Sequence, residues 1–101
     1  MTVGLSAVTM VKNGRVEDAI ANAKQSEEAL KAIGAANVRT MLLSLSTPIR
    51  IVTTFEAEDQ AALGAVMDKW QVDSRCQEIA AAGTADDGPL SGYLAETWIE
   101  V

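Results

Sequence analysis

The hydrophobic pattern of this 101-residue chain changes its period several times, and the order of those changes restricts the fold more than any single residue does. Apolar residues spaced three and four apart predict one helix from Arg15 to about Ile33 and another from Glu58 to about Ala82. Alternating or β-branched apolar stretches predict strands over 2–11, 37–46, 49–56 and 91–101. The predicted order is therefore β-α-β-β-α-β.

The predicted boundaries coincide with residues that break regular structure. Asn13-Gly14 predicts a turn after the first strand, Gly34 a helix stop, and Thr47-Pro48 a break between the second and third strands. This order is typical of one α+β domain over residues 1–101 with the ferredoxin-like arrangement. In that arrangement a four-stranded antiparallel sheet carries two helices on one face.

The strands carry apolar residues on both faces. Met41, Leu42 and Leu43 alternate sides within the second strand, and Val52 lies opposite the face that Ile51 and Phe55 share. Two helices cover only one face, so a monomer would expose a continuous apolar patch, which monomeric proteins seldom do. We expect the chain to form a homodimer, sheet against sheet.

The overall charge and the rare residue types exclude several classes of function. A net charge of −6 argues against nucleic acid and against an anionic membrane surface as partners. The chain has no histidine and only Cys76 as a thiol, so we expect no metal and no disulfide, and it has no glycine-rich nucleotide motif. We therefore expect no cofactor, and the absence of a signal-peptide pattern favours a cytoplasmic location.

Several segments resemble the dimeric α/β barrel superfamily. The run from Ile51 to Glu56 leads into an acidic helix start, and Gly64–Asp68, Val72-Asp73 and Glu96–Glu100 also fit that pattern. The superfamily includes antibiotic-biosynthesis monooxygenases, polyketide cyclases and uncharacterised members. The resemblance implies that two sheets enclose a central barrel, and that each subunit has a pocket between its sheet and its helices.

The first functional hypothesis is a binding protein for an elongated apolar small molecule, fatty-acid-like or polyketide-like, with an acidic head. Few polar groups interrupt the inner strand face, which is typical of ligand pockets, and an arginine could hold a carboxylate. Edge exposure or a cross-strand ion pair would also explain each arginine. The candidate ligand-binding residues are Val8, Met10, Arg39, Met41, Leu43, Arg50, Val52, Thr54 and Trp98.

The alternative is a cofactor-independent enzyme of the monooxygenase or cyclase type that acts on an enolisable ketone. Its candidate catalytic residues are Tyr93 and Glu96, which would move a proton, and Arg50, which would stabilise negative charge. Glu96 and Trp98 are two apart, so they share a face, and an indole beside a carboxyl group can raise its pKa. A dimeric module without any ligand is the third hypothesis.

Two loops have weaker signals. The segment from Gly83 to Gly92 is polar and rich in structure breakers, so it is expected to be the most mobile internal part of the chain. Lys12–Arg15 precedes a helix and is a candidate anion cradle, although the acidic Glu17 and Asp18 oppose an anion there.

Overall fold

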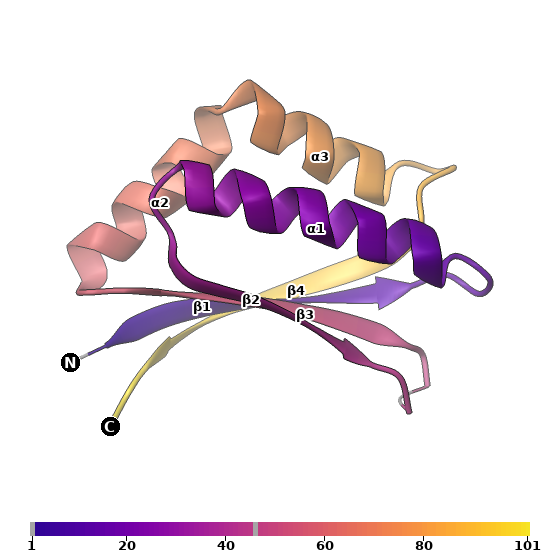
Figure 1. Cartoon of the computed structure of the whole chain (residues 1–101), viewed down its shortest axis with the longest axis horizontal. Helices are drawn as coiled ribbons and strands as arrows, with labels where there is room; N and C mark the ends of the chain where they lie inside the picture. The colour runs from indigo at the N-terminus through magenta and orange to yellow at the C-terminus, as the bar shows by residue number, and fades with distance from the viewer. Residues whose placement is uncertain (1, 46) are drawn as a thin grey trace.

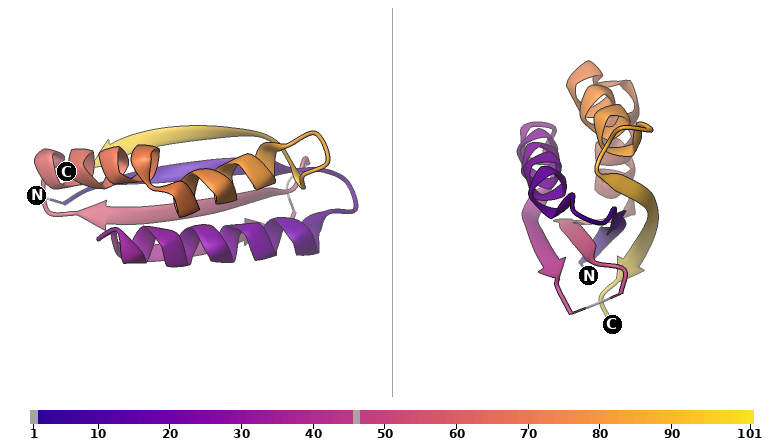
Figure 2. Two further views of the ribbon diagram at one scale, coloured as in Figure 1. Left: turned by 90° about the horizontal axis from the view of Figure 1, so that it is seen from above. Right: turned by 90° about the vertical axis from the view of Figure 1, so that its right-hand side faces the viewer.

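The computed structural model describes residues 2–45 and 47–101. The strands β1 to β4 form one antiparallel sheet in the order β2-β3-β1-β4, and the helices lie on one face of it (Figures 1 and 2). The predicted ferredoxin-like sheet is confirmed. In chain order the elements are β1 (Val3–Val11), α1 (Val16–Ala32), β2 (Ala36–Leu43), β3 (Arg50–Ala57), α2 (Gln60–Val72), α3 (Ser74–Thr84) and β4 (Leu90–Ile99).

Helix α1 begins and ends as its sequence predicts. Glu17 and Asp18 lie in the first turn, where carboxylates favour the positive end of the helix dipole. After the helix, Gly34 has a φ of 102°, a left-handed conformation that glycine adopts without the steric cost of a side chain. The backbone therefore turns at once into β2.

The prediction of a single second helix was wrong, because Asp73 divides it into α2 and α3. Asp73 has an extended backbone, with φ −75° and ψ 122°, and its carboxylate accepts a hydrogen bond from the backbone N–H of Cys76. Aspartate is a favourable N-cap because its oxygen satisfies an amide that the first turn leaves unpaired. The observed order is thus β-α-β-β-α-α-β.

The core lies between the helices and one sheet face. Alternate sheet positions, such as Val3, Val11, Ile51 and Phe55, point to this side and are buried. Cys76 and Ile79 pack with Ala29 where α3 meets α1. The three clusters occupy the space where the resemblance implied a subunit pocket. Their buried members are Val3, Leu30, Phe55, Leu63 and Val66; Val11, Ala19, Ala23, Ile51 and Leu90; and Ala29, Cys76 and Ile79.

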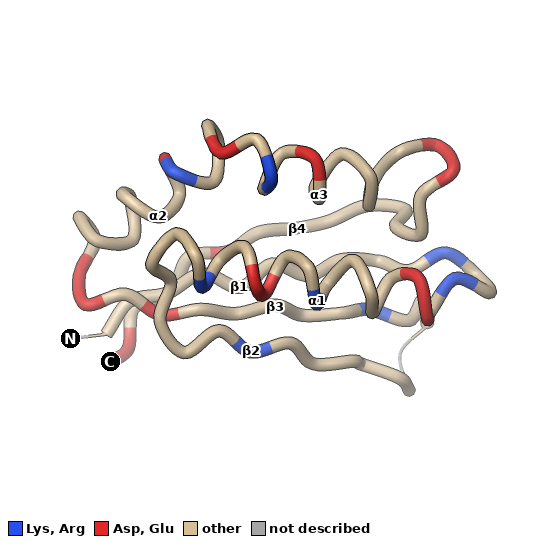
Figure 3. The backbone as a smooth tube through the Cα atoms, turned by 45° about the horizontal axis from the view of Figure 1, so that its top comes forward, with Lys and Arg blue, Asp and Glu red and all other residues tan. Residues whose placement is uncertain are grey.

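The loop between α3 and β4 is anchored to the turn between β1 and α1. Lys12 Nζ donates to the carbonyl of Asp86 at 2.8 Å, and Arg15 Nη1 donates to that of Asp87 at 2.9 Å. Figure 3 shows the acidic positions of this loop and the basic positions of the turn at the same end of the molecule. The two basic residues of the candidate anion cradle, Lys12 and Arg15, therefore bind carbonyl oxygens of this loop. Gly88 within the loop is buried.

Candidate ligand-binding face

The sheet face opposite the helices, which we call the helix-free face, has no covering element among the described residues (Figure 1). Strand register arranges its side chains in rows that cross all four strands, because directly paired residues point to the same side. Two complete rows lie in its middle. The apolar row is Met41, Val52, Val8 and Leu94, and the polar row is Arg39, Thr54, Ser6 and Glu96.

The apolar row is the most hydrophobic part of this face. Met41 on β2 is 39% exposed and Leu94 on β4 is 57% exposed, while Val8 and Val52 between them are half-buried. Four aliphatic side chains thus form an uninterrupted band from one sheet edge to the other. Water contact with such a band costs free energy in proportion to its apolar area.

The polar row lies beside the apolar row and carries one charge at each end. At its centre Ser6 Oγ donates to Thr54 Oγ1 at 3.2 Å, so the two hydroxyl groups satisfy each other in part. Arg39 occupies the β2 end and Glu96 the β4 end. Among the described residues, neither side chain takes part in an ion pair.

Two further rows flank these. Next to the apolar row lie Leu43, Arg50 and Met10, and Met10 extends over Gly92 of β4. On the far side of the polar row, Trp98 lies over Gly4. The face therefore offers large apolar side chains, with arginine and glutamate near its margins.

The structure brings most of the predicted site residues together. All nine predicted ligand-binding residues, together with Glu96, point to the helix-free face. Tyr93 does not, because it pairs with Thr9 and lies on the helix side of edge strand β4, where it is 63% exposed. Within one described chain, Tyr93 cannot share a site with Glu96 and Arg50.

Ser6 and Leu94 also belong to this face and were not among the predicted site residues. Ser6 completes the polar row and Leu94 completes the apolar row. The signal for both was the period of two, since Ser6 is two residues from Val8 and Leu94 is two residues from Glu96.

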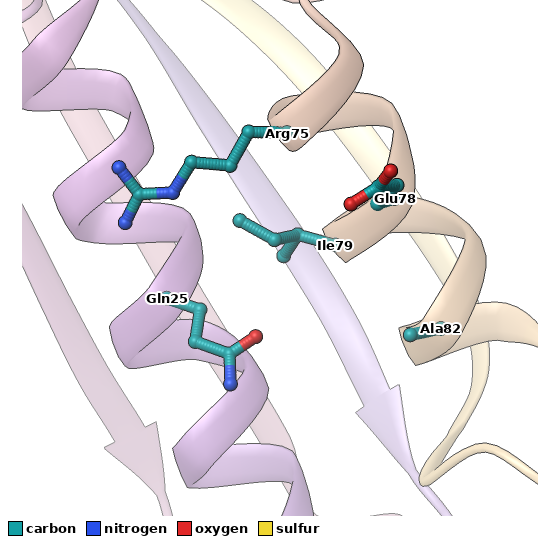
Figure 4. A pocket seen from close by; sticks show the side chains of 5 residues that line it. All are labelled: Gln25, Arg75, Glu78, Ile79 and Ala82. Carbon is teal, nitrogen blue, oxygen red and sulfur yellow. The ribbon is translucent and has the colours of Figure 1, made fainter.

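A second surface feature is a groove of about 390 Å³ between α1 and α3. Figure 4 shows Arg75 extending from α3 towards α1, with Gln25 on α1 and Ile79 between the helices. Glu78 and Ala82 complete its wall. The groove is open to solvent, and its charged residues have opposite signs, so it has no preference for one charge.

Three titratable groups outside the helix-free face have shifted pKa values. The hydrogen bond from the backbone N–H of Cys76 lowers the pKa of Asp73. Burial, helped by the nearby Asp73 carboxylate, raises the pKa of the Cys76 thiol to about 11, which keeps it protonated and unreactive near neutrality. A hydrogen bond from Thr40 lowers the pKa of Glu27 between α1 and β2. None of these three shifts serves a site on the helix-free face.

The described residues show neither a metal-binding cluster nor a helix suited to crossing a membrane. They contain no group of three or more cysteine, aspartate or glutamate side chains placed to hold a metal ion. None of their helices combines the length and the hydropathy that crossing a membrane requires.

Solved structures share this fold over nearly the whole chain. A NIPSNAP family protein from Agrobacterium tumefaciens superposes with a TM-score of 0.77 at 10% identity, covering 100% of this chain and 94% of that one. A putative antibiotic biosynthesis monooxygenase from Bordetella bronchiseptica gives 0.70 at 14% identity, covering 99% and 97%. Another antibiotic biosynthesis monooxygenase gives 0.75 at 12%, covering 98% of each.

These similarities confirm the resemblance of fold that the sequence suggested. No protein-family model and no curated protein matches the sequence. Identities of 10–14% establish a shared backbone arrangement, and one fold supports many chemistries. The activity must therefore be argued from the side chains on the helix-free face.

Proposed function

We propose that this protein is a homodimer that binds an elongated, mostly apolar small molecule between two helix-free faces. The observation that carries this proposal is the apolar row, Met41, Val52, Val8 and Leu94, which lies uncovered across the whole sheet. A second copy covers it most economically, because the same surface is present on every chain. A ligand then lies where the two apolar rows approach each other.

The charged margins indicate the chemical class of the ligand. Arg50 lies in the row beside the apolar row, next to Leu43 and Met10. A guanidinium there binds a carboxylate through two parallel hydrogen bonds, while the chain of the ligand runs over Val52 and Val8. A fatty-acid-like or polyketide-like acid combines these two features.

Two probes with the same alkyl chain distinguish the apolar contact from the contact between Arg50 and a carboxylate. Dodecanoate and dodecanol would be titrated into the wild-type protein by calorimetry, with the emission of Trp98 as a second signal in a Trp70→Phe background. We expect dodecanoate to bind, and Arg50→Gln to weaken its binding by at least about tenfold while leaving dodecanol binding unchanged, since one charged hydrogen-bonded contact is worth about 1.5–3 kcal/mol. Binding of neither probe would refute the proposal.

A steric variant identifies the face. Val8→Trp adds a large apolar group at the centre of the apolar row without adding a charge, so dimerisation should persist while dodecanoate binding is lost. Ala21→Trp, at an exposed position on α1, is the matched control and should bind as the wild type does. Unimpaired binding by Val8→Trp would place the ligand elsewhere.

The second candidate is an enzyme that acts on an enolisable ketone, and the names of the similar monooxygenase structures favour it. Glu96 and Arg50 share the helix-free face, so a carboxylate could take a proton from the carbon beside a carbonyl while a guanidinium stabilises the enolate. Proton–deuterium exchange at that carbon of a 1,3-diketone tests this. Exchange that the wild type catalyses and Glu96→Gln does not would favour the enzyme over the binding protein.

A further inference from the structure

The polar row has opposite charges at its two ends, and these ends are the two edges of the sheet. Arg39 is on edge strand β2 and Glu96 is on edge strand β4, in the same row through Thr54 and Ser6. Both charged side chains are exposed, and no ion pair among the described residues involves either of them. The row is therefore electrostatically complementary to a reversed copy of itself.

Only one kind of two-fold axis makes use of this complementarity. When two identical faces meet about an axis parallel to the strands, each row faces the same row of the other copy, and the two edges exchange places. Arg39 of each copy then faces Glu96 of the other, and the apolar rows face each other. This contact is isologous, so one arrangement forms the ion pair twice.

An axis across the strands does not form the pair between Arg39 and Glu96. Such an axis places β2 of one copy over β2 of the other, and it inverts the order of the rows between the two copies. If the polar rows coincide, Arg39 faces Arg39 and Glu96 faces Glu96, which is repulsive. If the axis lies midway between the polar and apolar rows, Arg39 faces Met41 and Glu96 faces Leu94, so both are desolvated without a partner, although Arg50 on β3 then faces Glu56 of the other copy.

The distance between packed sheets suits the pair that the parallel axis forms. Sheets that pack face to face are about 10 Å apart, and extended arginine and glutamate side chains together span that gap. At the sheet edges such pairs remain close to water, where they add more to specificity than to affinity. The apolar rows supply the affinity, and the charged ends select the orientation.

We propose that two copies of this chain pack their helix-free faces about a two-fold axis parallel to the strands, with Arg39 of each copy paired with Glu96 of the other. This inference rests on the proposed dimer and specifies its orientation. It also closes the two long sides of the ligand space, because each β2 edge then meets a β4 edge. A ligand between the central strands β3 and β1, beside Val52 and Val8, then requires the two sheets to lie farther apart at their centre than at these paired edges.

A charge-swap experiment tests this pairing directly. Arg39→Glu and Glu96→Arg are made singly, and the distribution of monomers and dimers is measured by native mass spectrometry and sedimentation. Each single variant alone places two like-charged pairs in its homodimer, so we expect dimerisation at least about tenfold weaker than in the wild type. Mixing the two variants gives two complementary pairs, so the heterodimer should predominate. The double variant Arg39→Glu/Glu96→Arg should regain homodimerisation.

Matched controls carry the same charge changes on exposed helix positions. Lys24→Glu and Glu17→Arg on α1 should dimerise as the wild type does, and mixing them should give homodimers and heterodimers in statistical proportion. Far-ultraviolet circular dichroism confirms that each variant folds. The neutral variants Arg39→Gln and Glu96→Gln provide a double-mutant cycle if either charge reversal disturbs folding, and a coupling energy indistinguishable from zero would overturn the pairing.

The outcomes separate this inference from the proposed function. A wild-type dimer whose charge-swapped variants also form homodimers with unchanged affinity, and mix statistically, would overturn the pairing and leave the ligand-binding dimer intact. A wild-type protein that is monomeric at low micromolar concentration would overturn both. Selective heterodimer formation would establish the pairing.

Discussion

The indole of Trp98 lies over the α-carbon of Gly4 on the neighbouring strand, and the two residues form a direct cross-strand pair. A β-carbon added to Gly4 would overlap Cζ2 of Trp98 and would come within 2.5 Å of the carbonyl oxygen of Phe55. The missing side chain thus makes the space that the indole fills. An aromatic ring across from a strand glycine also covers backbone that the glycine leaves exposed.

Gly4→Ala should therefore lower the free energy of unfolding by about 1–3 kcal/mol, since both the ring and a backbone oxygen must move. Urea denaturation measures the loss, and a shifted Trp98 emission in a Trp70→Phe background locates it. Gly64→Ala in α2 is the matched control. The added methyl there meets nothing within 4 Å, so stability should rise by up to about 1 kcal/mol. Equal effects of the two variants would contradict the contact.

The free energy of unfolding at acid pH should depend on Glu27. Thr40 Oγ1 donates to its carboxylate at 2.8 Å, Lys31 Nζ lies 3.2 Å away, and its pKa is lowered from 4.5. The folded state thus binds this proton less tightly than the unfolded state does. The resulting stabilisation is complete above about pH 4.5 and disappears as the pH falls through the lowered folded-state pKa.

Glu27→Gln should consequently be less stable than the wild type at pH 7, and the difference should shrink as the pH falls from 5 to 3. Urea denaturation at a series of pH values gives the two curves. Glu28→Gln is the control, because the Glu28 carboxylate is 67% exposed and its oxygen lies 3.9 Å from Lys31 Nζ. A pH-independent difference between wild type and Glu27→Gln would contradict the assignment.

The thiol of Cys76 should be inert in the folded protein. Its side chain is fully buried and its pKa is raised to about 11, so almost no thiolate forms at pH 8. We expect an aromatic disulfide reagent to react slowly in buffer and rapidly in urea. Fast reaction of the folded protein at pH 8 would contradict the burial of this side chain.

The same raised pKa predicts a loss of stability in alkali. The folded state holds the thiol proton more tightly than the unfolded state, whose thiol has a pKa near 9. The contribution is therefore intact below about pH 9 and is lost as the pH rises towards about 11. The stability difference between wild type and Cys76→Ala should change over this window, as denaturation at pH 8, 9, 10 and 11 would show.

The Gly88 amide, in the loop between α3 and β4, should exchange its hydrogen slowly. The Gly88 amide donates to the carbonyl of Ala85 at 2.8 Å, and Lys12 N donates to the carbonyl of Pro89 at 2.9 Å. Lys12→Ala combined with Arg15→Ala removes both side-chain bonds to this loop and should raise exchange over residues 84–89. Lys24→Ala should not. Exchange near the intrinsic rate in the wild type would support the sequence-based expectation of a mobile loop.

The period of two in the strands predicted most of the candidate site. Val8, Val52 and Met41 were expected on one face, and strand register aligns them in one row. The same rule applied to β4 separates Tyr93 from Glu96, which are three residues apart. Grouping these two as one catalytic set therefore conflicted with a pattern that was already visible in the sequence.

Other features depend on contacts that no local pattern contains. The break at Asp73 lies in Val72-Asp73-Ser74, without glycine or proline, and its only signal is a residue type that favours N-caps. The anchored loop depends on Lys12 and Arg15, which are more than 70 residues away from the carbonyls that they bind. Long-range bonds to backbone oxygens leave no trace in composition or periodicity.

The irregular start of β2 affects the tendency of the monomer to aggregate through this edge strand. Between Ala36 and Arg39 the pairing with β3 shifts, Asn37 has a φ of 50°, and its side-chain amide donates to Glu56. A bent edge presents fewer aligned N–H and C=O groups to a strand of another molecule. The bulge thus makes this edge a poor template for fibril growth, which protects a newly made chain while its apolar sheet surface is still exposed to water.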